Sequence, residues 1–403
     1  MNDGLDSWLD EWLSAHSEEL IADRRHLHAH PELSGEEVAT TEFIGERLQV
    51  AGLQPRLLTA GTGLLCDIGV GHGPTVALRA DIDGLAMDDE KDTPYRSRNP
   101  GVAHACGHDV HTTVVLGAGL ALNRYLDHAG VDGKVRLIFQ PAEETVPGGA
   151  LGVIADGGLD GIELIFGVHC DPRLEVGKVG LRSGAITSAA DMFELTLHGP
   201  GGHTARPERT VDLVAVAAQL VCRLPRMVND LAAGAGELSV VFGALRTGDA
   251  ANVIPATAVL RGSVRTPDRK AWDQAPRLLE SAVLDVLEGS EAEFELDYTR
   301  GVPAVVNDPA ATALMSDAIA VALGDKAIAT TAQSNGGDDF AWYLERTAGS
   351  YARLGVRNVD HQRALLDLHA SNFDVDEGAI AVGVRTLVTT ALRAIDERSS
   401  DRR

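Results

Sequence analysis

The chain has 403 residues, more than one hydrophobic core usually organises, so two domains are expected. Its formal net charge of -24 argues against nucleic acid and anionic membranes as partners, because both would repel the protein. No apolar stretch reads as a membrane span, and the acidic N-terminus lacks the pattern of a signal peptide. The four cysteines are too few for a disulfide scaffold, which predicts reduced thiols and a cytoplasmic protein.

The first part of the chain predicts helices followed by alternating strands and helices. Helices are expected over 7–30 and 35–51, where Pro31 and Gly52 end them. Another helix is expected at 112–125, among short apolar strands at 63–68, 75–79, 135–139, 164–168 and 176–181. This alternation predicts an α/β domain with a mainly parallel sheet flanked by helices.

A different order of elements occupies residues 188–300. Strand, helix, strand, strand, helix and strand are expected in turn, at 192–197, 211–228, 238–245, 258–264, 269–287 and 293–298. This βαββαβ order is the ferredoxin-like arrangement, a complete small α+β domain. Helices expected at 309–323 and 376–395 return to the first domain. We therefore expect a discontinuous α/β domain of residues 1–187 and 301–403, and an inserted ferredoxin-like domain of residues 188–300.

Acidic residues and a histidine follow three of the expected strands. Asp81 and Asp83 follow the strand at 75–79, and His169 follows the strand at 164–168. Glu143 and Glu144 follow the strand at 135–139. In open α/β sheets the ligand site lies beyond the carboxyl ends of the strands. Chemistry-bearing side chains at three strand ends therefore indicate one shared site.

The segment HACGHDVHT, at residues 104–112, concentrates possible metal ligands just before an apolar helix. Thiol and imidazole groups such as those of Cys106 and His108 suit zinc and related metals. The alternative is an ordinary helix start capped by Asp109 and Thr112, which would leave Cys106 and His108 unexplained. Metal binding is the better interpretation of this segment.

The adjacent acids Glu143 and Glu144 could share the work of a metal hydrolase. Adjacent acids alone are common on solvated faces, but here an apolar strand precedes them and Gly148-Gly149 follows. One carboxylate can bind metal while the other takes a proton from water.

Other polar residues have both a functional and an ordinary interpretation. His203 in GPGGHTARP could be an exposed loop histidine, and Arg265 and Asn252 are similarly ambiguous. His369 follows an apolar run and is kept as a candidate ligand, whereas the acids after it are interpreted as a capped helix start. Cys222, in apolar surroundings, is expected to be buried.

Taken together, these segments resemble the co-catalytic di-metal aminoacylase/carboxypeptidase family, in the amidohydrolase branch that includes hippurate hydrolases, auxin-conjugate hydrolases and N-acyl-amino acid amidohydrolases. The resemblance runs almost end to end. HACGHDVHT and PAEE are its most specific parts, and it also includes RRHLHAHPELSGEE, ALRADIDGL, GPGGHTARP, ANVIP, RGSVRT, GGDDFAWYLE and LHASNFDVDE.

The resemblance implies a metal-dependent amidohydrolase that converts N-acyl-amino acids to a carboxylic acid and a free amino acid. It implies two divalent metal ions per subunit, zinc in the first place and otherwise manganese, cobalt or nickel. The metal ligands that it implies are Cys106, His108, Glu144, His169 and His369. A dipeptidase or another small-amide deacylase of the same family remains the alternative.

Other roles are implied for residues around this ligand set. Glu143 matches the general base, and Asp83 matches an acid that orients a ligand from behind. His203 matches a histidine that reaches the partner subunit's active site and polarises the scissile carbonyl, in a homodimer formed through the inserted domain. Asn252 and Arg265 match positions that hold the carboxylate end of the substrate.

Two positions depart from the family pattern. Asp338 stands in GGDDF where the family usually has a glutamate, and Glu208 stands where a histidine is frequent. Both departures leave substrate choice open. A non-catalytic metal-binding module is a third interpretation, but it would be expected to have lost Glu143 or one of the ligands, and all of them are present.

Overall fold

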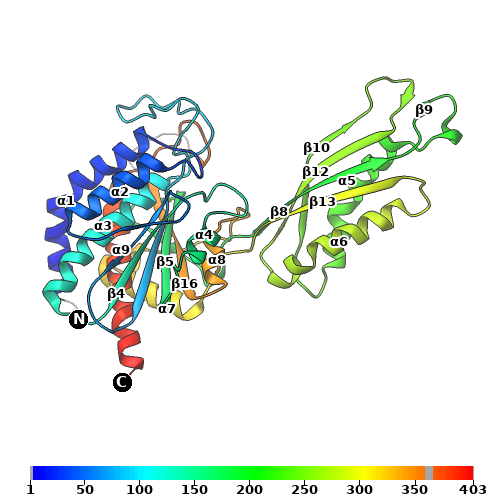
Figure 1. Cartoon of the computed structure of the whole chain (residues 1–403). Coiled ribbons are helices and arrows are strands. Elements are labelled where there is room, and N and C mark those ends of the chain that lie inside the picture. Colours follow the sequence, from blue (N-terminus) through cyan, green and yellow to red (C-terminus); the bar gives the residue numbers. More distant parts are fainter. Residues whose placement is uncertain (1–2, 359–365, 403) are drawn as a thin grey trace. The chain divides into compact units, whose positions relative to one another are not determined.

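A computed structural model describes residues 3–358 and 366–402. The chain forms two compact units (Figure 1). Unit 1 comprises Met1–Gly184, Val306–Ala332 and Trp342–Arg403, and unit 2 comprises Ala185–Val305 and Gln333–Ala341. The segment Gln333–Ala341 was predicted in the α/β domain but groups with unit 2, where Ser188 N–H donates to the Gly336 carbonyl at 3.0 Å and Arg265 donates to the Asn335 carbonyl.

Unit 1 contains a sheet in the order β1-β2-β4-β3-β5-β16-β6-β15. Its strands are β1 Arg56–Leu57, β2 Leu64–Ile68, β3 Thr75–Asp81, β4 Lys134–Gln140, β5 Ile162–Glu175, β6 Val179–Leu181, β15 Ile328–Thr330 and β16 Ala348–Arg357. The four central strands β4, β3, β5 and β16 run parallel, whereas β2 and β6 pair antiparallel with them. The sheet is therefore mixed and mostly parallel, as expected.

Helices cover this sheet through their apolar faces. They are α1 Asp3–Ala29, α2 Val38–Val50, α3 His108–Ala129, α4 Ala150–Ala155, α7 Pro309–Leu323, α8 Ala341–Leu344 and α9 Gly378–Asp401, with a short 3-10 turn at Asp325–Ala327. In Figure 1, α1, α2, α3 and α9 lie together on one side of the sheet, and α3 and α9 pack against β3. Their buried aliphatic side chains form one continuous core with the strands.

Among the described residues, α9 is the helix that is long and apolar enough to cross a membrane by length and composition. The sequence did not predict a segment of this kind. In the structure, 72% of the apolar window of α9 is buried inside the protein. Its apolarity is explained by its place in the core between α3 and α7.

Unit 2 contains a four-stranded antiparallel sheet in the order β10-β12-β8-β13. Its elements are β8 Ala189–His198, β9 Gly202–His203, a 3-10 turn Pro207–Arg209, α5 Leu213–Leu231, β10 Ser239–Thr247, β11 Val253–Ile254, β12 Thr257–Thr266, α6 Arg269–Leu287 and β13 Glu293–Val302. The buried faces of α5 and α6 form one core with alternate strand residues. The short β7 Gly184–Ala185 and β14 Val306–Asn307 lie at the chain's passages between the units.

Three local expectations differ from the structure. The strand expected at 176–181 begins only at Val179, because β5 continues to Glu175 and Gly177, at φ +88°, turns the chain. The ten-residue strand β16 was not expected at all. Cys222 is exposed, because α5 buries Leu220 and Leu224 and so directs the residue between them towards solvent.

Candidate metal centre and active site

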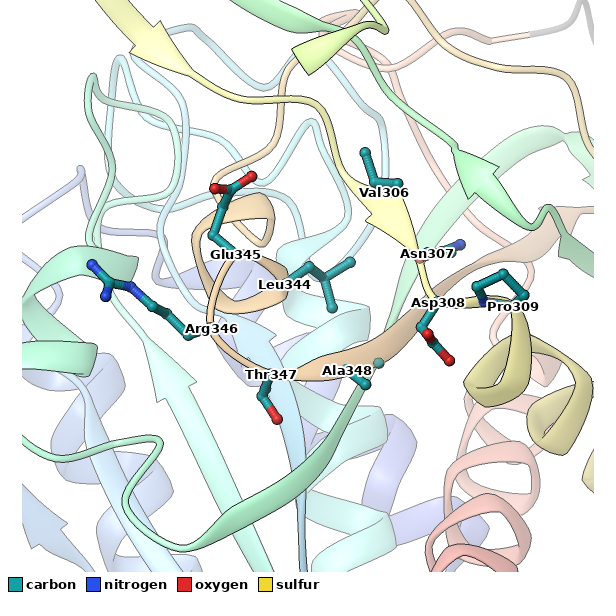
Figure 2. Close-up of a pocket in the computed structure, with 10 residues that line it drawn as sticks. Val306, Asn307, Asp308, Pro309, Leu344, Glu345, Arg346, Thr347 and Ala348 are labelled. Carbon is teal, nitrogen blue, oxygen red and sulfur yellow. The ribbon is translucent and has the colours of Figure 1, made fainter. Parts of the chain in front are cut away.

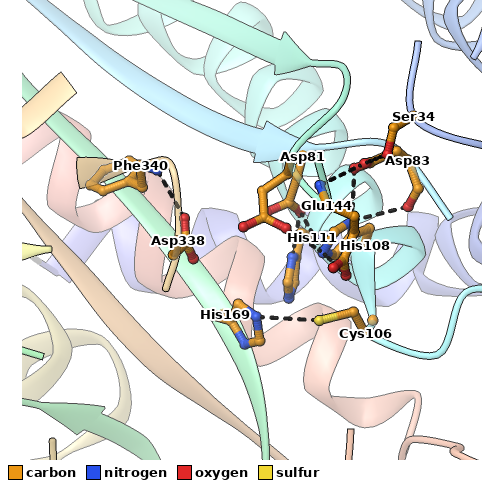
Figure 3. Close-up of polar contacts among 12 residues, drawn as sticks. Ser34, Asp81, Asp83, Cys106, His108, His111, Glu144, His169, Asp338 and Phe340 are labelled. Carbon is orange, nitrogen blue, oxygen red and sulfur yellow. Dashed lines mark hydrogen bonds and ion pairs between the residues drawn. The ribbon is translucent and has the colours of Figure 1, made fainter. Parts of the chain in front are cut away.

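The parallel strands of unit 1 bring their chemistry-bearing residues to one edge of the sheet. Asp81 is the last residue of β3, and it pairs in register with Gln140, the last residue of β4. His169 lies on the adjacent β5, which continues past it rather than ending there as expected. Side chains from all three strands and the loops after them nevertheless lie close together, although His169 lies within its strand and not at the end (Figure 3).

The five side chains expected as metal ligands lie together. Cys106 lies just before α3, and its Sγ is 3.6 Å from His169 Nε2. Glu144 Oε1 lies 3.8 Å from His108 Nε2 and 3.5 Å from His369 Nε2. Their donor atoms form overlapping groups, each within 4.8 Å: Cys106 with His108 and His169, Cys106 with Glu144 and His369, and His108 with Glu143 and Glu144.

The donor atoms fit a divalent cation. In the described part of the chain, His108 Nε2 and Glu144 Oε1 are buried without a hydrogen-bond partner. A buried polar atom without a partner is costly, and coordination of a cation would satisfy both atoms. Thiolate, imidazole and carboxylate are the groups that bind zinc-like metals. The geometry therefore supports a metal centre at this place.

His111 also lies near these groups, but both of its ring nitrogens are already used. Nδ1 lies 2.6 Å from Asp81 Oδ1, and Nε2 accepts the backbone N–H of Cys170 at 2.8 Å. His111 therefore holds the strand backbone next to His169. Burial alone would raise the pKa of Asp81, but His108 and Arg79 outweigh it and keep that pKa well below its ordinary value. This pair could not be predicted from the sequence, because nothing local shows which side chains His111 meets.

Asp83 makes hydrogen bonds to two of the candidate ligands, His108 and Glu144, through atoms that do not face the donor cluster. His108 Nδ1 lies 3.0 Å from the Asp83 carbonyl oxygen and 3.1 Å from Asp83 Oδ1, which leaves Nε2 directed at the donor cluster. Asp83 Oδ2 accepts the N–H of Glu144 at 2.9 Å and the hydroxyl of Ser34 at 2.7 Å. Contacts of this kind orient the ligands of metal sites.

Glu143 lies at the border of the cluster. Its Oε2 lies 3.8 Å from His108 Nε2, and its side chain is 12% exposed.

Two non-glycine residues near the cluster have left-handed backbone angles. Ala142, the residue before Glu143, has φ +57°, and His369 has φ +62°. Non-glycine residues rarely adopt such angles, and strained backbone of this kind collects at functional sites. The N–H of His369 donates to the Ala105 carbonyl at 2.8 Å, which holds His369 beside Cys106.

A buried ion network lies next to the candidate centre. Arg24 Nε donates to Asp109 Oδ2 at 2.6 Å, and His28 Nδ1 lies 2.7 Å from the same oxygen. Arg24 also pairs with Asp374 and Glu377, which follow His369 in sequence. The alternative interpretation, in which Asp109 caps a helix, does not hold, because α3 has no side-chain cap and α1 supplies a cationic partner for Asp109 instead.

The site residues expected in unit 2 fall into two places. His203 is exposed on β9, and its Nδ1 accepts the N–H of Ala205 at 3.0 Å. Asn252 is next to it, since its carbonyl accepts the N–H of Thr204 at 3.2 Å. Asn252 lies five residues before Thr257, the first residue of β12. Arg265 lies eight positions further along β12, about 26 Å from Thr257 at about 3.3 Å per residue, and it donates to the Asn335 carbonyl. One copy of unit 2 therefore does not bring Arg265 and Asn252 together.

The two departures from the family pattern also lie in unit 2. Asp338 is buried, and its Oδ1 accepts the N–H of Phe340 at 2.9 Å (Figure 3). Glu208 is exposed in the turn Pro207–Arg209. A carboxylate at 338 therefore stabilises its own loop.

A pocket of about 430 Å³ lies elsewhere in unit 1 (Figure 2). It is lined by Val306–Pro309 and Leu344–Gly349, at the starts of α7 and β16. Its lining includes none of the expected site residues. This pocket is therefore separate from the candidate metal centre.

Metal affinity is expected to rise with pH. Burial raises the pKa of the Cys106 thiol far above its ordinary value, and burial also raises the pKa of Glu144. Cys106 is therefore protonated at neutral pH in the metal-free protein, and it would release this proton if it served as a metal ligand. For each proton that a ligand releases when metal binds, the affinity for the metal increases about tenfold per pH unit. Competition with a chromophoric chelator at pH 6, 7 and 8 measures this slope, and an affinity independent of pH would contradict it.

Comparisons with known proteins place this arrangement in a family. Residues 77–393 match the sequence model of Peptidase family M20/M25/M40. The N-acetyl-L-cysteine deacetylase of Bacillus subtilis is 38% identical over 391 residues, which cover 97% of this chain and 91% of the deacetylase. A Rhodococcus jostii protein named as a glutamate–cysteine ligase is 45% identical over 380 residues, 94% of this chain. The chain spans only 47% of the length of that protein.

Solved structures give the same assignment. The crystal structure of a dinuclear metal-binding peptidase of the M20 family from Bacillus subtilis matches with a TM-score of 0.82 and 31% sequence identity. The match covers 95% of this chain and 99% of that chain, so it includes both units. With its sequence match and its overall structure in agreement, the chain belongs to Peptidase family M20/M25/M40.

Proposed function

We propose that the chain hydrolyses the amide bond of N-acyl-amino acids, with Glu143 as general base and then general acid. That it is a metal-dependent amide hydrolase follows from its family, from its deacetylase relative and from the dinuclear structure. The observation that carries the residue assignments is the meeting of five donor side chains beside Glu143.

In this proposal, two divalent cations per subunit are held by Cys106, His108, Glu144, His169 and His369. The thiol and imidazole donors favour zinc, although manganese, cobalt and nickel suit similar sites. Asp83 orients His108 and Glu144 through the contacts described above. When bound, the cations supply Lewis acidity, which lowers the pKa of water and stabilises negative charge on oxygen.

Glu143 performs the proton transfers. Its carboxylate accepts a proton from the attacking water as the water oxygen bonds to the amide carbon. The same carboxyl group then delivers that proton to the amide nitrogen as the carbon–nitrogen bond breaks. One residue acts as base and then as acid, which leaves it unchanged after each turnover.

Unit 2 is assigned a ferredoxin-like fold and the role of a dimerisation domain. Its βαββαβ order and the strand order β10-β12-β8-β13 support the fold. The edge strand β10 exposes Val241 and Leu245, which a second copy could cover. Since Arg265 and Asn252 lie apart in one copy, a single substrate carboxylate can meet both only if two copies of the chain contribute. A homodimer supplies this arrangement.

His203 is assigned to the scissile carbonyl in the partner's active site. Because its Nδ1 accepts the N–H of Ala205, the neutral ring carries its proton on Nε2. That N–H could donate to the carbonyl oxygen. The protein is assigned to the cytoplasm, which is supported by the absence of a disulfide among the four cysteines, all of them in the described part of the chain.

A hydrolysis panel with the metal-reconstituted protein tests the function. N-acetyl-, N-benzoyl- and long-chain N-acyl-amino acids are compared with simple dipeptides, and release of the free amino acid is measured. We expect metal-dependent turnover of the acylated set. Activity on dipeptides alone would assign the chain to the dipeptidase alternative, and no turnover of any member with metal bound would refute the proposal.

A further inference from the structure

We propose that Glu37 is a positioning residue for Glu143: its buried carboxylate holds the backbone at Ala142 and so fixes the base next to it. This inference rests on the proposed function, in which Glu143 is the general base. Glu37 belongs to the segment RRHLHAHPELSGEE, to which the proposed mechanism gives no other part.

Glu37 reaches across the fold to the residue before the base. Its side chain is fully buried, and its Oε1 accepts the N–H of Ala142 at 2.7 Å, although the two residues are 105 positions apart. The same oxygen accepts the N–H of Gly35 at 2.9 Å. Hydrogen bonds from N–H groups to a carboxylate are about twice as strong as those between neutral groups.

Ala142 needs such support because its backbone is strained. Its φ of +57° lies in the left-handed region, which non-glycine residues avoid. Its carbonyl accepts the N–H of Gly149 at 2.9 Å, so both of its peptide groups are held. Strained angles persist only where the surrounding contacts fix them firmly.

Two carboxylates therefore hold the chain on either side of Glu143. Glu37 binds the N–H of Ala142, and Asp83 binds the N–H of Glu144 at 2.9 Å. Because two different segments hold the N–H groups of Ala142 and Glu144, the backbone at Glu143 is fixed, and so is the direction in which its side chain leaves the backbone. Catalysis by a base depends on such alignment, since a displacement of about 1 Å can cost about a hundredfold in rate.

Glu37 is not explained by the helix that it precedes. It occupies the N-cap position of α2 but makes no side-chain cap to that helix. The N–H groups of Ala39 and Thr40 in the first turn of α2 donate to Glu32 instead. The buried carboxylate of Glu37 is thus directed at the loop of the base.

Substitutions of Glu37 test whether its hydrogen bond to Ala142 or its negative charge is what matters for kcat. In Glu37→Gln the amide oxygen can accept the same two N–H groups, so kcat should stay within about twofold of the wild type. In Glu37→Asp the charge remains, but the side chain is shorter by one methylene and no longer reaches Ala142. We expect kcat of Glu37→Asp to fall about tenfold to a hundredfold, with KM and bound metal nearly unchanged. Glu36→Ala, at the exposed neighbouring position, is the matched control.

Backbone hydrogen exchange gives a readout that does not depend on activity. The Ala142 N–H should be protected in the wild type, in Glu37→Gln and in Glu36→Ala, and should exchange faster in Glu37→Asp. Wild-type exchange and wild-type kcat in Glu37→Asp would overturn the inference, as would a loss in Glu37→Gln equal to that in Glu37→Asp. If the wild-type protein hydrolyses no panel member, the proposed function fails, and the exchange result still decides whether Glu37 holds this loop.

Discussion

Replacing Glu143 by alanine is expected to lower kcat about a thousandfold while the protein still binds its metal ions. Glu143 lies 3.8 Å from His108 Nε2, but the contacts between the other candidate ligands do not involve it. In the proposed mechanism, its removal takes away the group that moves the proton and leaves the candidate metal ligands in place. Steady-state kinetics together with metal analysis by mass spectrometry measure both properties.

The matched variant is Glu144→Ala, one residue along the same loop. Glu144 lies between His108 and His369, and its Oε1 is one of the buried atoms without a hydrogen-bond partner in the described structure. Its loss should lower metal affinity as well as kcat, because a donor is removed. If Glu143→Ala kept near-normal turnover, or if both variants lost metal equally, the division of roles between the two acids would be wrong.

The grouping of the donor side chains could be predicted because each donor lies in a short local pattern. Cys106 and His108 share one segment, and Glu144 and His169 follow apolar strands. Neighbouring parallel strands end at the same edge of a sheet, so strand assignments translate directly into proximity. His369 was a candidate because it follows an apolar run, and the family resemblance added it to the implied ligand set.

The strand β16 could not be predicted, because its burial depends on distant neighbours. Its sequence, AGSYARLGVR, contains Arg353 and two glycines, which interrupt an apolar pattern. In the structure it lies between β5 and β6, and Arg353 is buried there. Those neighbours are far away in the chain, and local propensity carries no information about them.

The supporting contacts of the site were hidden for a similar reason. Arg24 and Asp109 are 85 positions apart, and Glu37 and Ala142 are 105 positions apart. An acid near the start of a helix has the same local sequence whether it caps that helix or binds another segment. Capping was therefore an open alternative for Asp109, whereas the structure provides Arg24 and His28 of α1 as its partners.

Replacing Arg24 by methionine is expected to destabilise unit 1 by about 3–5 kcal/mol, because it removes the arginine that pairs with the buried Asp109 carboxylate. Both side chains are 1% exposed. Arg25→Met is the control, since Arg25 is 49% exposed and its ion pair with Glu377 should contribute at most about 1 kcal/mol. Urea unfolding of the metal-free variants at pH 7 compares the two losses.

The pH dependence of this loss has a definite sign. Burial would raise the pKa of Asp109, but Arg24 and His28 outweigh it and hold that pKa well below its ordinary value. A carboxyl group with a depressed pKa in the folded state stabilises the protein above its unfolded pKa of about 4 and loses this contribution as pH falls. The difference between wild type and Arg24→Met should thus be complete at pH 7 and shrink in acid.

Adding Asp109→Asn to Arg24→Met tests the cause directly. If the unpaired buried charge is responsible for the destabilisation, the double variant should recover part of the stability that Arg24→Met loses. A double variant less stable than Arg24→Met would show that the lost packing of the arginine, and not the buried charge of Asp109, dominates the destabilisation. Because Arg24 also pairs with Asp374 and Glu377, beyond His369 in the chain, a true loss of the network should weaken metal binding in the same variants.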